Sequence, residues 1–307
     1  MLMWRFVTSE RVADMDQILR GRTVFPTNAD YNDPGGIHDD ATAQELGFRG
    51  GTIAGSAHLD TFVPLLVQAF GDEWFRSGSL SIYFRHATTD GEPTEAFVEL
   101  PEKVELPVAT WQARVWISTP DGTVIGEGTA SVGELPEGID TALGQRDLRH
   151  DPANARILAG VERGQVLGPE SRHISAARVA HGCDHRITEP LDWYRQPSPW
   201  GGPVAPPSAL IDLYSQIAGN ALLPQLGSAV GMWGALEVRF HDGPLFLDVD
   251  YDVEAVVASV SDSPKTEILW FDACARQQGR LVASGRVLSR FVKSSSPLYA
   301  DGTRTTD

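Results

Sequence analysis

Apolar residues recur at helical spacing in two stretches of the chain, one in each half. The first stretch carries Leu59, Phe62, Val63, Leu66 and Phe70, and the second carries Leu210, Leu213, Tyr214, Ile217 and Ala221. Each member of the second set follows its counterpart in the first by 151 residues. This spacing predicts two apolar helices that are related by an internal repeat.

Alternating apolar and polar residues follow each predicted helix. The alternation covers Leu80, Ile82 and Phe84 in the first half, and Leu236, Val238 and Phe240 in the second. Further strands are predicted over residues 95–100, 111–118, 253–259 and 266–273. Each half therefore reads as one apolar helix with about four antiparallel strands, and such a helix would be wrapped by its own sheet. The pattern predicts an α+β fold made of two similar units.

The stretch between the two units lacks a clear period. Residues 133–170 mix Gly, Pro, Asp and Arg, and we interpret them as a crossover with one short helix near residues 153–161. The predicted division is an N-terminal domain over residues 1–135, a linker over 136–170 and a C-terminal domain over 171–293. The polar segment 294–307 is expected to be a flexible tail.

Composition narrows the class of protein. The 307 residues are 42% hydrophobic and 21% charged, which is typical of a globular protein with a full core. A formal net charge of −16 argues against a nucleic-acid or anionic-membrane partner. The two cysteines form neither a disulfide framework nor a metal motif. No signal pattern and no apolar run of about 18 residues are present, so we expect a cytoplasmic protein without a membrane span.

A turn-rich acidic segment precedes the first predicted helix and carries the candidate chemistry. It contains Asp30, Asp33 and His38, and Asp40 is placed to cap a short helix that ends near Gly47. His38 thus lies on a loop between a tight turn and a helix start. Loops held by rigid neighbours often carry catalytic groups.

These residues resemble the MaoC-like (R)-specific enoyl-CoA hydratase/dehydratase family, and the duplicated pattern resembles a tandem (double) hot-dog fold. In that family a D-x-N-P-x-H loop supplies the catalytic pair, and Asp33 and His38 have its five-residue spacing. Pro34-Gly35-Gly36 stands where the family has x-N-P. A second alignment takes Asp30-Tyr31-Asn32 as the D-x-N portion, so either aspartate is a candidate base.

The helix entry departs from the family as well. The usual A-H-G reads Ala54-Gly55-Ser56 here, and the second half has no Asp-x4-His run, so we expect it to be catalytically degenerate. The resemblance implies that Asp33, or Asp30, is the base and that His38 is its partner in proton transfer. It also implies a set of oxyanion and substrate-binding candidates, which are Gly55, Ser56, Ala57, Tyr31, Arg49 and Arg85.

The implied activity is that of an enoyl-thioester hydratase or 3-hydroxyacyl-thioester dehydratase, a lyase of lipid or polyketide metabolism. Its substrate would be carried on CoA or phosphopantetheine, without a further cofactor or a metal. An acyl carrier protein is a candidate partner, and a monomer or a homodimer would satisfy the duplicated fold. Two alternatives stay open: a hot-dog thioesterase that depends on Asp60, and a non-catalytic acyl-binding protein in polyketide or other secondary metabolism.

Overall fold

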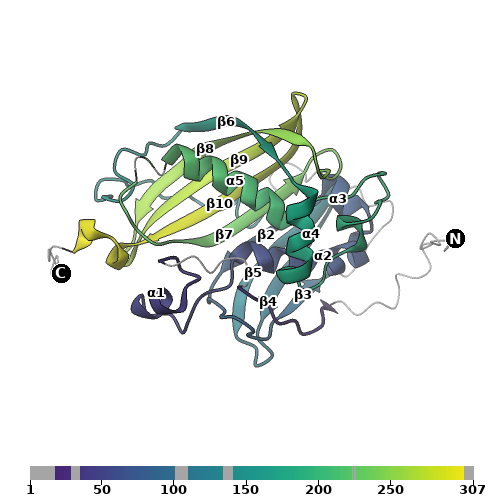
Figure 1. Ribbon diagram of the computed structural model, residues 1–307, viewed down its shortest axis with the longest axis horizontal. Coiled ribbons are helices and arrows are strands. Elements are labelled where there is room, and N and C mark those ends of the chain that lie inside the picture. Colours follow the sequence, from purple (N-terminus) through teal and green to yellow (C-terminus); the bar gives the residue numbers. More distant parts are fainter. Residues whose placement is uncertain are drawn as a thin grey trace.

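The computed structural model describes residues 18–28, 35–100, 110–133, 141–222, 224 and 226–300. Ten strands of this part of the chain form a single antiparallel sheet, in the order β1-β3-β4-β5-β2-β7-β10-β9-β8-β6 (Figure 1). The strands of the first half are β1 (Ile18–Arg20), β2 (Ser79–Phe84), β3 (Glu95–Glu99), β4 (Thr110–Ser118) and β5 (Val124–Gly133). Those of the second half are β6 (Val166–His173), β7 (Gly231–Phe240), β8 (Asp250–Asp262), β9 (Thr266–Gln277) and β10 (Arg280–Val292).

The two halves of the sheet have the same strand order. Counted outward from the middle, the first half runs β2, β5, β4, β3, β1 and the second runs β7, β10, β9, β8, β6. The halves join where β2 pairs with β7, with Leu80 opposite Val238 and Ile82 opposite Leu236. Leu236 is the repeat counterpart of Leu80, and Val238 is that of Ile82. The pairing register therefore follows an approximate twofold axis, as a duplicated sequence would produce.

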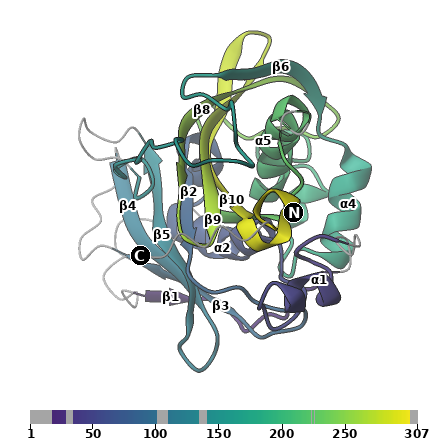
Figure 2. The same cartoon turned by 90° about the vertical axis from the view of Figure 1, so that its left-hand side faces the viewer.

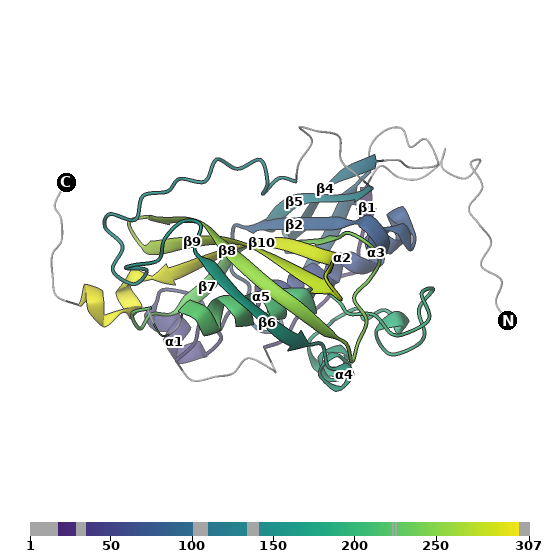
Figure 3. The ribbon, with the colours of Figure 1, turned by 90° about the horizontal axis from the view of Figure 1, so that it is seen from above.

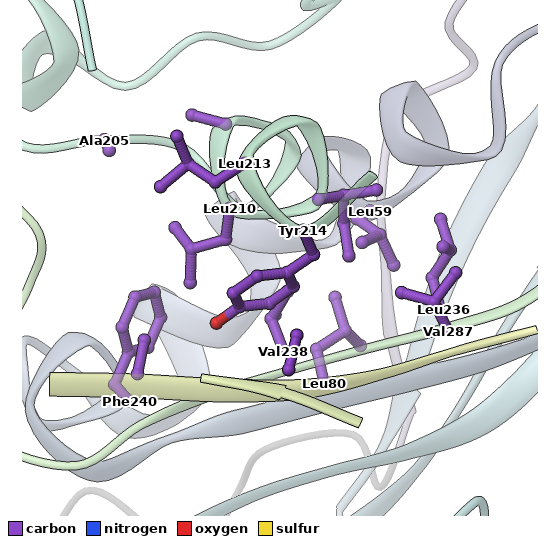
Figure 4. Packing of buried hydrophobic residues seen from close by; sticks show 14 of the residues in the cluster. Leu59, Leu80, Ala205, Leu210, Leu213, Tyr214, Leu236, Val238, Phe240 and Val287 are labelled. Atoms are coloured by element: carbon purple, nitrogen blue, oxygen red, sulfur yellow. The ribbon is translucent and has the colours of Figure 1, made fainter. Parts of the chain in front are cut away.

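Two long helices cover one face of the sheet. They are α2 (Gly55–Phe70) and α5 (Pro207–Leu222), and both lie on the same side of the strands as α4 (Ala176–His185) (Figures 2 and 3). Figure 4 shows Leu59 of α2 and Tyr214 of α5 meeting side chains of the central strands, such as Leu80 and Val238. The main apolar core is thus continuous across both halves.

Residues 141–165, which lead into the second half, run over the opposite face of the sheet (Figure 3). There Leu143 packs with Ala235, Trp270 and Leu288 in a second, smaller apolar cluster. The prediction of a short helix near residues 153–161 was wrong, because this stretch forms turns. β6 begins inside the segment predicted as a linker, and the domain boundaries stay a prediction.

The remaining elements are short. They are α1 (Asp40–Glu45), α3 (Glu73–Ser77), and the 3₁₀ turns at Asp192–Tyr194, Lys293–Ser295 and Pro297–Tyr299. The Tyr299 hydroxyl donates a hydrogen bond of 2.5 Å to Glu267 Oε1, so part of the segment predicted as a flexible tail is packed on the protein.

None of the helices in the described ranges has the length and apolar character needed to cross a membrane.

Candidate active site

A cavity of about 620 Å³ lies beside the first residue of α2. Both halves of the chain line it, which no pattern in the sequence indicated. The first half contributes His38, Gly55, His58 and Thr88, and the second contributes Met232, Trp233, Arg290 and Phe291. The wall from the second half comes from the start of β7 and the end of β10. A ligand in this cavity would contact both repeats.

The loop that carries His38 is fixed by its contacts with the Gly50-Gly51 turn. The Thr52 N–H donates to the Ile37 carbonyl over 3.0 Å. A Cβ atom on Gly51 would lie only 2.1 Å from the His38 carbonyl oxygen. The glycine therefore allows the two segments to approach, and this approach sets the position of the histidine.

The ring of His38 has a defined tautomer. Its Nδ1 lies 2.6 Å from the Thr52 carbonyl oxygen. Because a carbonyl oxygen only accepts hydrogen bonds, Nδ1 must carry the proton. The lone pair of the neutral ring is then on Nε2, which is the atom able to take up a proton.

The acidic residues that follow His38 have structural roles. Asp39, and not Asp40 as predicted, caps α1, because its carboxylate accepts the Thr42 N–H over 2.9 Å. This side chain also accepts the Thr42 hydroxyl, and these hydrogen bonds lower the pKa of Asp39. Asp40 instead accepts the Gly51 N–H over 2.7 Å and so ties α1 to the glycine turn.

The start of α2 presents backbone amides near the cavity. The first N–H groups of a helix have no acceptor within the helix. The Ala57 N–H is already used, since it donates to the Ala54 carbonyl over 3.0 Å. Ser56 and Ala57 are buried, whereas Gly55 lines the cavity. Of the three predicted oxyanion candidates, Gly55 is therefore the one that faces the cavity.

His58 is a cavity residue to which the sequence assigned no role. It lies three residues after Gly55, is only 2% exposed, and its Nε2 is 2.8 Å from the Thr88 hydroxyl. Burial lowers its pKa to about 4, so the ring is neutral at pH 7. Because His58 lies three residues after Gly55, helical spacing could have placed it on the same side of α2 as Gly55. A histidine on an apolar helix, however, gives no indication of a nearby cavity.

Of the other predicted site residues, some lie outside the described ranges and two lie near the cavity. Asp30, Tyr31 and Asp33 lie outside the described residues. Arg49 forms an ion pair of 2.6 Å with Glu92 in an adjoining cavity of about 730 Å³. Arg85 lines both cavities and pairs with Glu127 over 2.9 Å. Both arginines thus lie near the site, and each already has a carboxylate partner.

Asp60 faces away from this site. It is 1% exposed, and its Oδ1 accepts the Ser208 N–H over 3.0 Å at the start of α5. Burial raises its pKa to about 6, against the opposing effect of the Arg186 charge. Asp60 is not among the residues that line the 620 Å³ cavity. It caps the helix of the other half.

Aromatic side chains of both halves meet at Phe75 of α3. Phe75 packs against Trp193 and Trp200, with both ring-centroid distances at 5.9 Å, and against Phe240 at 5.6 Å.

Within the described ranges, no group of three or more His, Cys, Asp or Glu side chains is arranged to hold a metal ion.

No family model matches the sequence, and no curated protein matches it. Solved structures do match. A MaoC domain protein dehydratase from Chloroflexus aurantiacus superposes with a TM-score of 0.60 at 12% identity, covering 89% of this chain and 95% of that one. A hypothetical protein from Mycobacterium tuberculosis with a double hot-dog fold gives a TM-score of 0.57 at 14% identity, covering 89% and 95%. A MaoC-like dehydratase gives 0.54 at 12% identity, covering 90% and 97%.

These likenesses concern the fold. The chain resembles double hot-dog proteins and MaoC-like dehydratases in structure over nearly its full length. At such low identity the likeness does not carry over an activity, which has to be argued from the site.

Proposed function

We propose that the protein adds water to, or removes it from, the α,β-double bond of an acyl thioester carried on CoA or phosphopantetheine. One observation carries the proposal: His38 and the start of α2 line the same cavity. An imidazole and a helix start therefore lie around one ligand-sized space, and we assign proton transfer to the first and stabilisation of the developing oxyanion to the second. Those are two of the three requirements of this reaction, and the third is a base.

The helix start would act on the thioester carbonyl. Gly55 is the first residue of α2, at the positive end of the helix dipole, and its amide would donate to the carbonyl oxygen. Negative charge accumulates on that oxygen when hydroxide adds to the β-carbon. Stabilisation of this enolate-like state lowers the barrier for the addition and equally for its reverse.

The loop would carry the groups that transfer protons. We assign the base to Asp33, with Asp30 as the alternative, and the second proton-transfer group to His38 Nε2. Water loses a proton as its oxygen bonds to the β-carbon, and the α-carbon gains one, so that one water molecule is consumed. The Thr52 carbonyl holds His38 in the tautomer that this role needs.

The wall from the second half would hold the acyl chain. Met232, Trp233 and Phe291 are apolar side chains on the side of the cavity that the second half provides. Cavities with apolar walls and a few placed polar groups are typical of small-molecule sites. The degenerate repeat would thus bind the substrate without taking part in the chemistry.

The thioesterase that depends on Asp60 has less support. Asp60 caps α5 from within the core and does not line the cavity. No described carboxylate replaces it beside the start of α2. We therefore prefer the hydratase, and we keep hydrolysis as an outcome that the experiment can detect.

The test measures the loss of the ultraviolet absorbance of the conjugated enoyl thioester, with crotonyl-CoA and longer enoyl-CoAs. We expect His38→Gln to lower kcat/KM by about 10²–10⁴-fold, and Asp33→Asn or Asp30→Asn to do the same. The matched control is His241→Gln. His241 lies in the second half with its Nε2 2.8 Å from the Ser284 hydroxyl, and this variant should keep its rate.

Two results would contradict the proposal. One is full hydration activity in His38→Gln, and the other is release of free CoA without hydration of the double bond. The second result would favour a thioesterase. An absence of turnover on any chain length, with tight binding of acyl-CoA, would favour the acyl-binding alternative.

A further inference from the structure

Three arginines contact Tyr83 near the end of β2, and a fourth, Arg114, lines a cavity with it. The Arg146 guanidinium lies 4.0 Å from the centre of the Tyr83 ring, and that of Arg85 lies 4.9 Å from it. Arg290 donates a hydrogen bond of 2.8 Å to the Tyr83 hydroxyl. Arg114 approaches the group through Glu127, which both it and Arg85 contact. We call this set the Tyr83 arginine cluster.

The cluster has more positive than negative charge. Glu127 serves Arg85 and Arg114, and Glu99 lies 3.6 Å from Arg114. Within the described ranges, no carboxylate lies within ion-pairing distance of Arg146 or Arg290. Four cations thus share two carboxylates in a chain whose net charge is −16. Like charges held this close repel one another, and an added anion would relieve the repulsion.

The cluster is connected to the candidate active site. Tyr83 and Arg85 line the 620 Å³ cavity and also a neighbouring cavity of about 310 Å³. Arg290 lines the first of these cavities and Arg146 lines the second. A chain-like ligand could therefore extend from Gly55, past Tyr83, to the arginines. Its anionic end would lie on the cluster and its reactive end at the start of α2.

We propose that the Tyr83 arginine cluster binds the phosphate groups of the carrier on which the acyl thioester is held. Guanidinium groups match phosphate oxygens in geometry and stay charged at every working pH. This inference deepens the proposed function, on which it rests for the identity of the ligand. The phosphates would belong to the nucleotide of coenzyme A or to a phosphopantetheine arm, two sources with the same chemistry.

The test measures binding, so it does not need turnover. The probes for the full-length protein are coenzyme A, adenosine 3′,5′-bisphosphate, 4′-phosphopantetheine and unphosphorylated pantetheine, titrated by calorimetry. We expect Arg146→Gln and Arg290→Gln each to raise the Kd for coenzyme A by about tenfold or more, since each removes a charge-assisted contact. Arg146→Lys should recover part of the affinity, and added salt should weaken binding to the wild type. Pantetheine should bind equally to all variants.

The matched control is Arg280→Gln. Arg280 is an exposed arginine of the second half that pairs with Asp242 over 2.5 Å, and it lies outside the three cavities. Its removal should leave the Kd unchanged. If binding of the bisphosphate depends on the arginines, the phosphates come from coenzyme A. If only binding of phosphopantetheine depends on them, the phosphate comes from a carrier protein.

An unchanged Kd for coenzyme A and phosphopantetheine in the double variant Arg146→Gln/Arg290→Gln would overturn the inference, and so would a wild type that binds no phosphate probe. The two proposals fail separately. Binding that depends on the arginines, without hydration, would leave the phosphate site standing and remove the hydratase. Hydration at normal KM in the double variant would support the hydratase and remove the phosphate site.

Discussion

At the scale of single residues, the position of His38 depends on the absence of a side chain at Gly51. The glycine passes so close to the His38 carbonyl that a Cβ would overlap it at 2.1 Å. The same carbonyl region is held by the Ile37 and Thr52 backbone contact. Because the backbone leaves no space, a methyl group there must displace the loop and the imidazole with it.

We therefore expect Gly51→Ala to lower hydration activity on the order of 10²-fold, as misplacement of a catalytic group by about 1 Å can do. Crowding should also destabilise the fold by about 1–3 kcal/mol. Steady-state kinetics and thermal melting measure the two effects. The control is Gly202→Ala at the repeat-related position, where a Cβ would meet Phe246 at an ordinary 3.4 Å. Equal activity in the two variants would contradict this account.

At the scale of elements, the two long helices are linked by a cap that crosses between the halves. Asp60 belongs to α2 but accepts the Ser208 N–H of α5. Its carboxylate is thus at the positive end of the other helix, with Arg186 and Ser208 also in contact with each other. Burial of this charge has a cost, which appears as the raised pKa of about 6.

This pKa gives Asp60→Asn a defined pH dependence. Between pH 3.8 and about 6 the folded wild type holds a proton on Asp60 that the unfolded chain has lost, so its stability falls as pH rises. The asparagine variant lacks this loss and keeps an acceptor for Ser208. Its stability relative to the wild type should rise by about 3 kcal/mol over that window and then stay level.

Denaturant unfolding at several pH values measures this difference. Asp60→Ala, which also leaves the Ser208 N–H without its acceptor, should be less stable than Asp60→Asn at every pH by about 1 kcal/mol or more. A stability difference between Asp60→Asn and wild type that does not change with pH would contradict the assignment. The asparagine variant should also retain hydration activity.

Across the full structure, the two halves share one sheet and one core. β2 and β7 pair over Ser79–Tyr83 and Ala235–Arg239, and the main apolar cluster includes residues of both long helices. Neither half could lose its packing without exposing apolar surface of the other. The protein should therefore unfold as one cooperative unit, although its sequence is a tandem repeat.

Scanning calorimetry tests this expectation. We expect a single transition in which the calorimetric and van't Hoff enthalpies agree. Two resolved transitions, one removed by a destabilising change such as Leu210→Ala and the other by Leu59→Ala, would show that the halves unfold independently. Both leucines are fully buried, so each substitution should cost about 2–5 kcal/mol.

Local patterns in the amino-acid sequence predict the repeated elements of the fold. The periods of the apolar residues placed both long helices and the strands at β2, β3, β4, β7, β8 and β9, because alternation and helical spacing are local properties of the chain. The edge strands β1 and β6 escaped prediction. They have few buried residues, and β6 contains Gly168 and Pro169, so their main contribution is backbone pairing.

The assembly of the candidate site depends on contacts between distant parts of the chain. It placed the Thr52 carbonyl on His38, brought Trp233 and Phe291 of the second half to the cavity, and turned Asp60 toward α5. Each of these contacts joins residues that no local period relates. The loop pattern could single out His38 as a candidate, but its tautomer and its neighbours depend on backbone approach and sheet register, which exist only in the folded chain.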